Sequence, residues 1–143
     1  MDPYQSKIVK TDLYTQKTEI HGNLVAVLDW AHDNRKLELI YPASRCLLKN
    51  EIHELILTDE KAKPGDIVNK VSYIGFFEVK NGGVILQGDE ILIGDQFIGE
   101  IAGYDETHMP NHMNIVIYSS ILSTGQDKGL KLNEKVIIRK SEK

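Results

Sequence analysis

Residues 71–104 read VSYIGFFEVKNGGVILQGDEILIGDQFIGEIAGY, and this stretch decides the fold. Short runs rich in β-branched and aromatic residues alternate in it with turn residues, which is the pattern of successive short strands. The turn residues Asn81-Gly82-Gly83 and Gly94-Asp95 tolerate positive φ angles, so each group predicts a tight hairpin. Gly75 interrupts the first run at a point where a neighbouring backbone or a ligand can approach closely.

The same pattern continues on both sides, and no window of 11 or more residues keeps apolar positions at helical spacing. Strands are predicted over residues 24–29, 37–41, 54–58, 71–80, 84–87, 90–93, 96–104, 113–118 and 135–139. A short helical turn is predicted only within residues 42–50, where Pro42 can occupy an early helical position. The sequence therefore predicts an all-β fold, a small closed or partly open β-barrel of about nine short strands with at most one short helical turn.

The chain has 143 residues, of which 41% are hydrophobic, enough for one buried core. We expect a single β-barrel domain over residues 21–139. A poorly patterned N-terminal segment, residues 1–20, precedes it, and a solvated tail, residues 140–143, follows it. Because unpaired edge strands of small barrels are often covered by a second copy, a homodimer is the default expectation.

Composition narrows the class of partner. The 17 basic and 21 acidic residues give a formal net charge of −4, which provides no long-range attraction to nucleic acid or to an anionic membrane, so neither is expected as a partner. Cys46 is the only cysteine, which leaves no internal disulfide and suits a reducing compartment. The N-terminal segment lacks the apolar core of a signal peptide, so a cytoplasmic location is expected.

The densest polar cluster lies between two predicted strands and spans residues 105–112, DETHMPNH. Surface connections between rigid strands commonly carry function, so these residues are candidates for binding a small polar ligand or a protein partner. The ligand-binding candidates in this loop are Asp105, Glu106, His108, Asn111 and His112. The alternative is that these side chains cap turns and bond to the backbone of an ordered loop.

The same loop also contains candidate metal ligands. The two histidines, His108 and His112, together with the carboxylates of Asp105 and Glu106, could supply nitrogen and oxygen ligands to zinc or another divalent ion. Pro110 disfavours a continuous helix, so the convergence of these groups depends on the path of the loop. A divalent metal is therefore a candidate cofactor.

Two further clusters contain candidate residues. Cys46 could act as a nucleophile with His53 as its base, or it could be a small buried apolar residue, and its neighbour Arg45 is a candidate for binding a ligand. Trp30, with His32 and Arg35, could form one wall of a pocket that holds a carboxylate or phosphate. The alternative for this second cluster is a hairpin loop in which Trp30 covers the end of the barrel.

Three segments, SRCLLKNEIHELILTDE (44–60), VSYIGFFEVKNGG (71–83) and GDEILIGDQFIGEIAGYDETHMPNHMNIVI (88–117), resemble a small bacterial protein family of unknown function. The resemblance covers roughly residues 24–139 and includes the motif GYDETHMPNHMN. It implies a single bacterial domain and no particular reaction.

A more distant resemblance concerns the fold. The order and spacing of ELILTDEKAKPGD (54–66), VSYIGFFEV (71–79) and GDEILIGDQFIGEIAG (88–103) are similar to those of the glucitol/sorbitol-specific IIA component of the sugar phosphotransferase system, a small β-barrel. In that family a histidine in the strand matching residues 71–79 carries the phosphoryl group, and here that strand has no histidine. Phosphoryl carriage would therefore need His53, His108 or His112.

Two functions follow from these observations, and whether the chain is an enzyme stays open. The first is a small-ligand or partner-binding accessory module that uses the loop of residues 105–112. The alternative is a small metal-assisted hydrolase or lyase, in which a metal held by His108 and His112 activates a water molecule.

Overall fold

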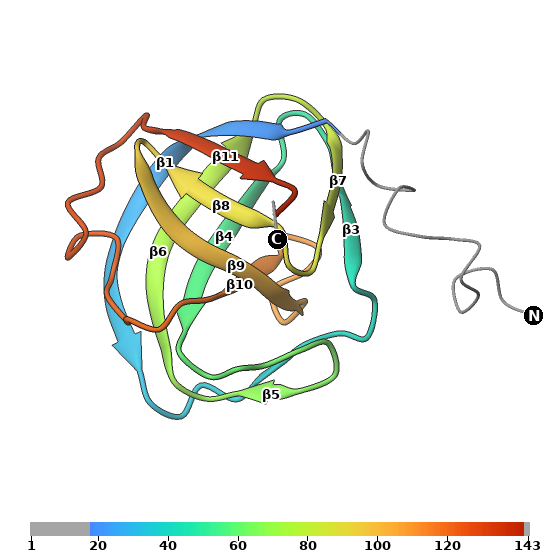
Figure 1. The fold of residues 1–143 in the computed structure, drawn as a ribbon, viewed down its shortest axis with the longest axis vertical. Coiled ribbons are helices and arrows are strands. Elements are labelled where there is room, and N and C mark those ends of the chain that lie inside the picture. The colour runs from blue at the N-terminus through green and yellow to red at the C-terminus, as the bar shows by residue number, and fades with distance from the viewer. Residues whose placement is uncertain (1–17, 142–143) are drawn as a thin grey trace, which may run out of the picture.

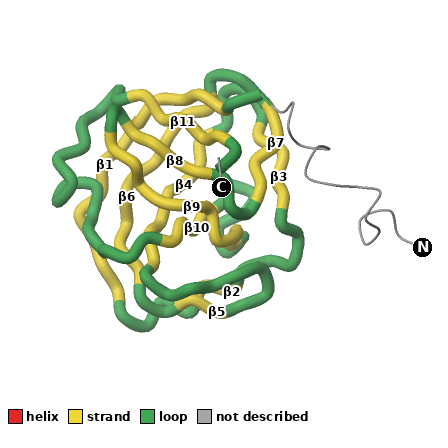
Figure 2. The backbone as a smooth tube through the Cα atoms, in the orientation of Figure 1, coloured by secondary structure: helices red, strands yellow, loops and turns green. Residues whose placement is uncertain are grey.

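The structure is a computed structural model that describes residues 18–141, and its regular elements are strands joined by turns and loops (Figures 1 and 2). The strands are β1 (Ile20–His32), β2 (Leu37–Glu38), β3 (Ser44–Leu47), β4 (Ile52–Thr58), β5 (Ile67–Val68), β6 (Val71–Val79), β7 (Gly83–Leu86), β8 (Glu90–Ile93), β9 (Gln96–Asp105), β10 (Asn114–Tyr118) and β11 (Lys135–Arg139). The all-β prediction is confirmed. Within the described range no helix is long and apolar enough to cross a membrane.

Seven strands close into a barrel in the order β1-β11-β8-β9-β10-β4-β6, with β6 pairing back to β1. Every neighbouring pair in this ring is antiparallel except β10 and β4, which run parallel. Two short ladders, β2–β5 and β3–β7, lie outside the ring, as Figure 2 shows. Most of the N-terminal segment and half of the C-terminal tail lie outside the described residues, which leaves the expectations for them untested.

Nine of the eleven strands match predicted ones, and the two that the sequence pattern missed are β3 and β5. The helical turn predicted within residues 42–50 is wrong, because Ser44–Leu47 is the strand β3 and pairs with β7. In this ladder Leu47 is buried while Cys46 is exposed, so the segment alternates as a strand does. Its partner lies about 40 residues further along the chain, which no local pattern reveals.

The two predicted hairpins have different outcomes. Gly94 has φ 58° and joins β8 to β9 in a tight antiparallel pair, as predicted. The hairpin predicted at residues 81–83 is wrong, because β7 pairs with β3 and not with β6. The glycines there serve close approach: a Cβ at Gly82 would lie 3.0 Å from the Leu47 carbonyl oxygen, and one at Gly83 would lie 2.5 Å from the side chain of Ile20.

The strand β10 is buried on both faces, in the alternation that its sequence predicts. Met113, just before it, and then Ile115 and Ile117 face the barrel core, whereas Val116 and Tyr118 pack in a second apolar cluster outside the ring. That outer cluster includes residues of β2 and β5, which cover part of the barrel wall. The outer faces of β10 and of the strands beside it are thus partly covered by this packing and are not fully exposed to water.

A bulge in β6 changes which side chains face outward. Leu55 pairs with Gly75 and Ile56 pairs with Tyr73, so Ile74 is an extra residue in the ladder. The sequence pattern, read as a strict two-residue alternation, predicts Tyr73 and Phe77 on one face; this is wrong, because Phe77 is in the core and Tyr73 is in the outer cluster. The bulge puts Tyr73 on the outside of the barrel, the same side as Phe76, which alternates with the core residue Phe77.

Candidate functional site: a pocket beside the loop of residues 105–112

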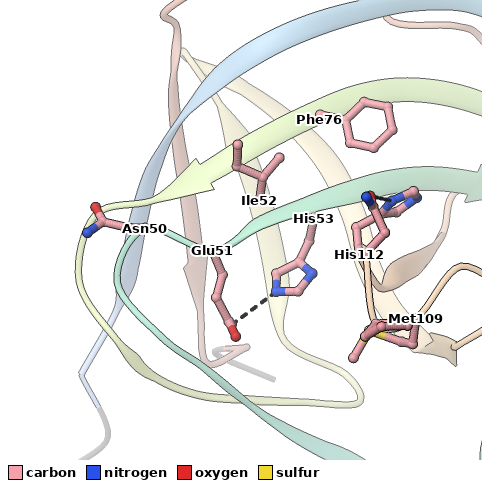
Figure 3. A pocket seen from close by; sticks show the side chains of 9 residues that line it. Asn50, Glu51, Ile52, His53, Phe76, Met109 and His112 are labelled. Carbon is pink, nitrogen blue, oxygen red and sulfur yellow. Dashed lines mark hydrogen bonds and ion pairs between the residues drawn. The ribbon is translucent and has the colours of Figure 1, made fainter.

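A pocket of about 470 Å³ lies between the end of the polar loop and the start of β4 (Figure 3). It is lined by Asn50, Glu51, Ile52, His53, Phe76, Met109, Pro110, Asn111 and His112. One wall is thus four consecutive residues of the loop, and the facing wall comes from the residues that enter β4, with Phe76 from β6. The volume falls in the range of pockets that hold small molecules.

Beneath the loop, four neighbouring strands each contribute one residue to a row on the outer face of the barrel. Phe76 of β6 pairs with Glu54 of β4, Glu54 pairs with Asn114 of β10, and Asn114 pairs with Asp105 of β9. Glu54 is 7% exposed, Asp105 is 2% exposed and Asn114 is fully buried. The row therefore places two carboxyl groups and an amide under cover, in contact with the loop.

Asp105 holds the two ends of the loop together. Its Oδ1 atom accepts hydrogen bonds from the backbone N–H of Thr107 at 3.0 Å and from the side-chain Nδ2 of Asn114 at 3.0 Å. Its Oδ2 atom accepts a bond from the hydroxyl of Thr107 at 2.9 Å. Aspartate commonly stabilises a turn by bonding to the backbone two residues further on. The predicted candidate Asp105 thus shapes the loop and does not line the pocket.

His112 is the loop residue most firmly fixed in the pocket wall. Its Nδ1 atom lies 2.8 Å from the side-chain oxygen of Asn111, and its Nε2 atom lies 3.3 Å from Oε1 of Glu54. The Phe76 ring meets the imidazole edge to face, with the ring centroids 5.0 Å apart. Because the Asn111 oxygen can only accept, we assign the ring proton to Nδ1, which leaves Nε2 as an acceptor.

The contact between Glu54 and His112 holds a proton near neutral pH. Burial raises the pKa of Glu54 to about 7, against the opposing positive charges of His108 and Arg35, and the charge of Asp105 raises it further. Burial also lowers the pKa of His112, which favours its neutral form. A protonated Glu54 carboxyl can donate to His112 Nε2. The burial of both groups and the tautomer assigned to His112 therefore both favour the proton on Glu54.

His108 stands behind His112, away from the pocket lining. The two imidazole centroids are 5.0 Å apart, and His108 Nε2 lies 3.4 Å from Nη2 of Arg35. The Nε atom of Arg35 donates to the hydroxyl of Tyr73 at 2.8 Å. Sequence reasoning grouped Arg35 with Trp30, but the structure brings it to the loop, whereas Trp30 is 62% exposed and does not line this pocket.

The candidates Arg45 and Glu106 form an ion pair with each other, and neither lines the pocket. The proposed pairing of Cys46 with His53 has no support in the bonding of the imidazole. His53 is buried, its Nδ1 atom accepts from the backbone N–H of Met113 at 3.1 Å, and its Nε2 atom faces Oε1 of Glu51 at 3.1 Å. Both ring nitrogens are thus engaged, and Cys46 is exposed on β3.

Glu51 belongs to the cluster around Cys46 and His53, and sequence reasoning gave it no role there. Its Oε1 atom accepts bonds from the backbone N–H of Leu48 at 2.8 Å and from His53. Partial burial acts to raise the pKa of Glu51, but these two bonds and the electrostatic attraction of His53 and Arg45 outweigh it and hold the pKa below its ordinary value. Figure 3 shows the Glu51 carboxylate and the His53 ring turned toward each other.

The four candidate metal ligands of the loop do not gather around one point. Asp105 is bonded within the loop, Glu106 is paired with Arg45, and His108 faces the cationic Arg35. Among residues 18–141, no group of three or more His, Cys, Asp or Glu side chains is arranged to hold a metal ion.

A family model described as "Family of unknown function (DUF6917)" matches residues 14–139. The chain belongs to this family. The match confirms the expectation of an uncharacterised family over most of the chain, and membership assigns no reaction. Comparison with curated proteins and with solved structures gave no match, so the resemblance to the glucitol/sorbitol-specific IIA component gains no support there.

Proposed function

We propose that this member of the DUF6917 family binds a small polar molecule in the pocket between residues 50–53 and 109–112. The observation that carries the proposal is the pocket itself, which combines apolar walls with a few fixed polar groups. Ile52, Phe76 and Met109 supply apolar surface, and Glu51 and Asn111 supply polar atoms. Small-molecule sites commonly have this composition, in which apolar surface provides affinity and a few polar groups set orientation.

The pocket is also held in shape before any ligand arrives. Asp105 ties the loop to the ends of β9 and β10, and His112 is held between Glu54, Phe76 and Asn111. Side chains fixed by neighbouring strands lose little entropy on binding, which favours affinity.

This proposal changes the roles of the predicted loop residues. Asn111 and His112 contact the ligand, and Glu51 joins them from the opposite wall. Asp105 and His108 support the loop from behind.

The test is a binding screen of small polar metabolites by ligand-observed NMR, with a variant that fills the pocket. Ile52 is partly exposed and lines the pocket, so a tryptophan at this position should occupy its volume while leaving the barrel intact. Ile67→Trp on β5 is the matched control, because Ile67 is also exposed and lies outside this pocket.

We expect at least one compound to bind the wild type and Ile67→Trp, and to bind Ile52→Trp at least about tenfold more weakly. Circular dichroism and thermal unfolding establish that both variants fold. Compounds that bind both variants equally would place the binding elsewhere, and a screen without binders would overturn the proposal.

A further inference from the structure

We infer that the pocket selects a cationic ligand, an organic amine whose ammonium group lies beside the Glu51 carboxylate. This inference rests on the proposed function and adds the chemical class of the ligand. Three observations carry it: the charge on the pocket walls, the bonding of Glu51 and the position of the nearby cations.

The walls carry negative charge and no fixed positive charge. Among residues 18–141, no lysine or arginine lines the pocket, and Glu51 is the one carboxylate among the lining residues. Its lowered pKa keeps it ionised at neutral pH. An anionic ligand would therefore meet a like charge with no lysine or arginine in the described walls to balance it, whereas an ammonium group would gain a charge-assisted hydrogen bond.

Glu51 is fixed in place but still accessible. Its Oε1 atom is engaged by the Leu48 amide and by His53, while its Oε2 atom accepts no hydrogen bond from the described residues. The Glu51 side chain is 38% exposed, so a bound group can reach it without moving the loop. A carboxylate oriented by one oxygen and open at the other is suited to receive an ammonium N–H.

The two arginines nearest the loop already have partners elsewhere. Arg45 pairs with Glu106, and Arg35 bonds to Tyr73 and faces His108. Neither lines the pocket. His112 offers no free donor to an anion either, because its Nδ1 atom faces Asn111 and its Nε2 atom faces Glu54. The apolar part of the pocket, including Phe76, is left to hold the carbon skeleton of the amine.

Three probes of similar shape and different charge test the inference: phenethylamine, 2-phenylethanol and 3-phenylpropionate. Each is titrated into ¹⁵N-labelled protein at low salt and neutral pH, and the amide shifts of residues 50–53, Met109, Asn111 and His112 report binding in the pocket. We expect the amine to bind about tenfold more tightly than the alcohol, and the carboxylate to bind most weakly. The preference should decrease as salt is added, because Glu51 is partly exposed.

Glu51→Gln separates charge from structure, since the glutamine carbonyl can still accept the bonds that Oε1 accepts. In this variant the preference for the amine over the alcohol should disappear, while the affinity for the alcohol changes little. Glu38→Gln on β2 removes an equal charge at an exposed position outside the pocket and should leave the preference intact.

The outcomes distinguish this inference from the proposed function. If the alcohol or the carboxylate binds in the pocket as tightly as the amine, or if Glu51→Gln keeps the amine preference, the ammonium assignment is wrong and the pocket stands. If none of the three probes shifts the pocket amides, and the metabolite screen with Ile52→Trp also finds no binder, both are overturned. Amine binding that Ile52→Trp does not weaken lies outside the pocket and overturns the inference.

Discussion

The glutamate under the loop should make the stability of this protein depend on pH in a way that one substitution removes. Glu54 has an ordinary pKa of 4.5 in the unfolded chain and a pKa of about 7 in the folded one. Between these values the folded state holds a proton that the unfolded state has released. Stability from this group is therefore fully present below pH 4.5 and is lost as pH rises through 7. The loss is about 3 kcal/mol, at 1.36 kcal/mol per unit of pKa shift.

Glu54→Gln should abolish this loss, because a glutamine amide stays neutral and can donate to His112 Nε2 as the protonated carboxyl does. We expect the variant and the wild type to be about equally stable near pH 4.5, and the variant to be up to about 3 kcal/mol more stable near pH 8. For a domain of this size the difference corresponds to a melting temperature raised by roughly 10 °C.

The assay is urea unfolding of both proteins at intervals between these pH values, read as the difference in free energy of unfolding. The lowered pKa of His112 acts in the opposite direction, costing stability as pH falls below its ordinary 6.5, but it contributes to both proteins and largely cancels in the difference. Glu38→Gln on the exposed strand β2 serves as the control and should give a flat difference. A flat difference for Glu54→Gln as well would refute the reasoning, because it would mean that burial does not hold the proton on Glu54.

Two further predictions concern the scaffold of the site. Asp105→Ala removes the acceptor for both bonds from Thr107 and should lower the free energy of unfolding in urea by roughly 2–4 kcal/mol. Amide exchange over residues 106–112 should become faster, and unchanged exchange would contradict the role of Asp105 as the anchor of the loop. Gly75→Ala places a Cβ 2.1 Å from the Ala26 carbonyl oxygen and should lower the free energy of unfolding by about 3 kcal/mol or more. Gly88→Ala, with nothing within 4 Å, should lower it by only about 1 kcal/mol because of its positive φ, and equal losses would show that β1 and β6 move apart easily.

The sequence predicted the features that depend on neighbouring residues. The alternation in residues 113–118 put Ile115 and Ile117 on one face and Val116 on the other, and the structure separates them in this way, because a strand repeats every two residues regardless of its partner. The hairpin at Gly94 followed from the need for a positive φ between two apolar runs. Both are local properties, which the order of residue types encodes directly.

Features that depend on distant pairing were missed or misjudged. Whether residues 44–47 form a strand is decided by β7, and the face on which Tyr73 lies is decided by one extra residue in β6 opposite β4. At the site, the loop and the cluster around Cys46 and His53 were both identified, but their meeting in one pocket was not, because the two segments are far apart in sequence. One signal was available in the sequence: Glu54 is an acid within the predicted apolar strand ELILT, and a charged side chain at a buried position needs a compensating partner.

The parallel pairing of β4 and β10 in the barrel links the pocket to the folding of the chain. The two walls of the pocket are the segments that lead into β4 and β10, and parallel strands bring their leading segments to the same end. Joining these strands closes a loop of more than 50 residues, which costs more chain entropy than closing a hairpin. A molecule that contacts both walls holds β4 and β10 together, so its binding free energy opposes the opening of the barrel between them. Binding in the pocket should therefore slow the hydrogen exchange of backbone amides along the whole length of β4 and β10, including positions far from the pocket.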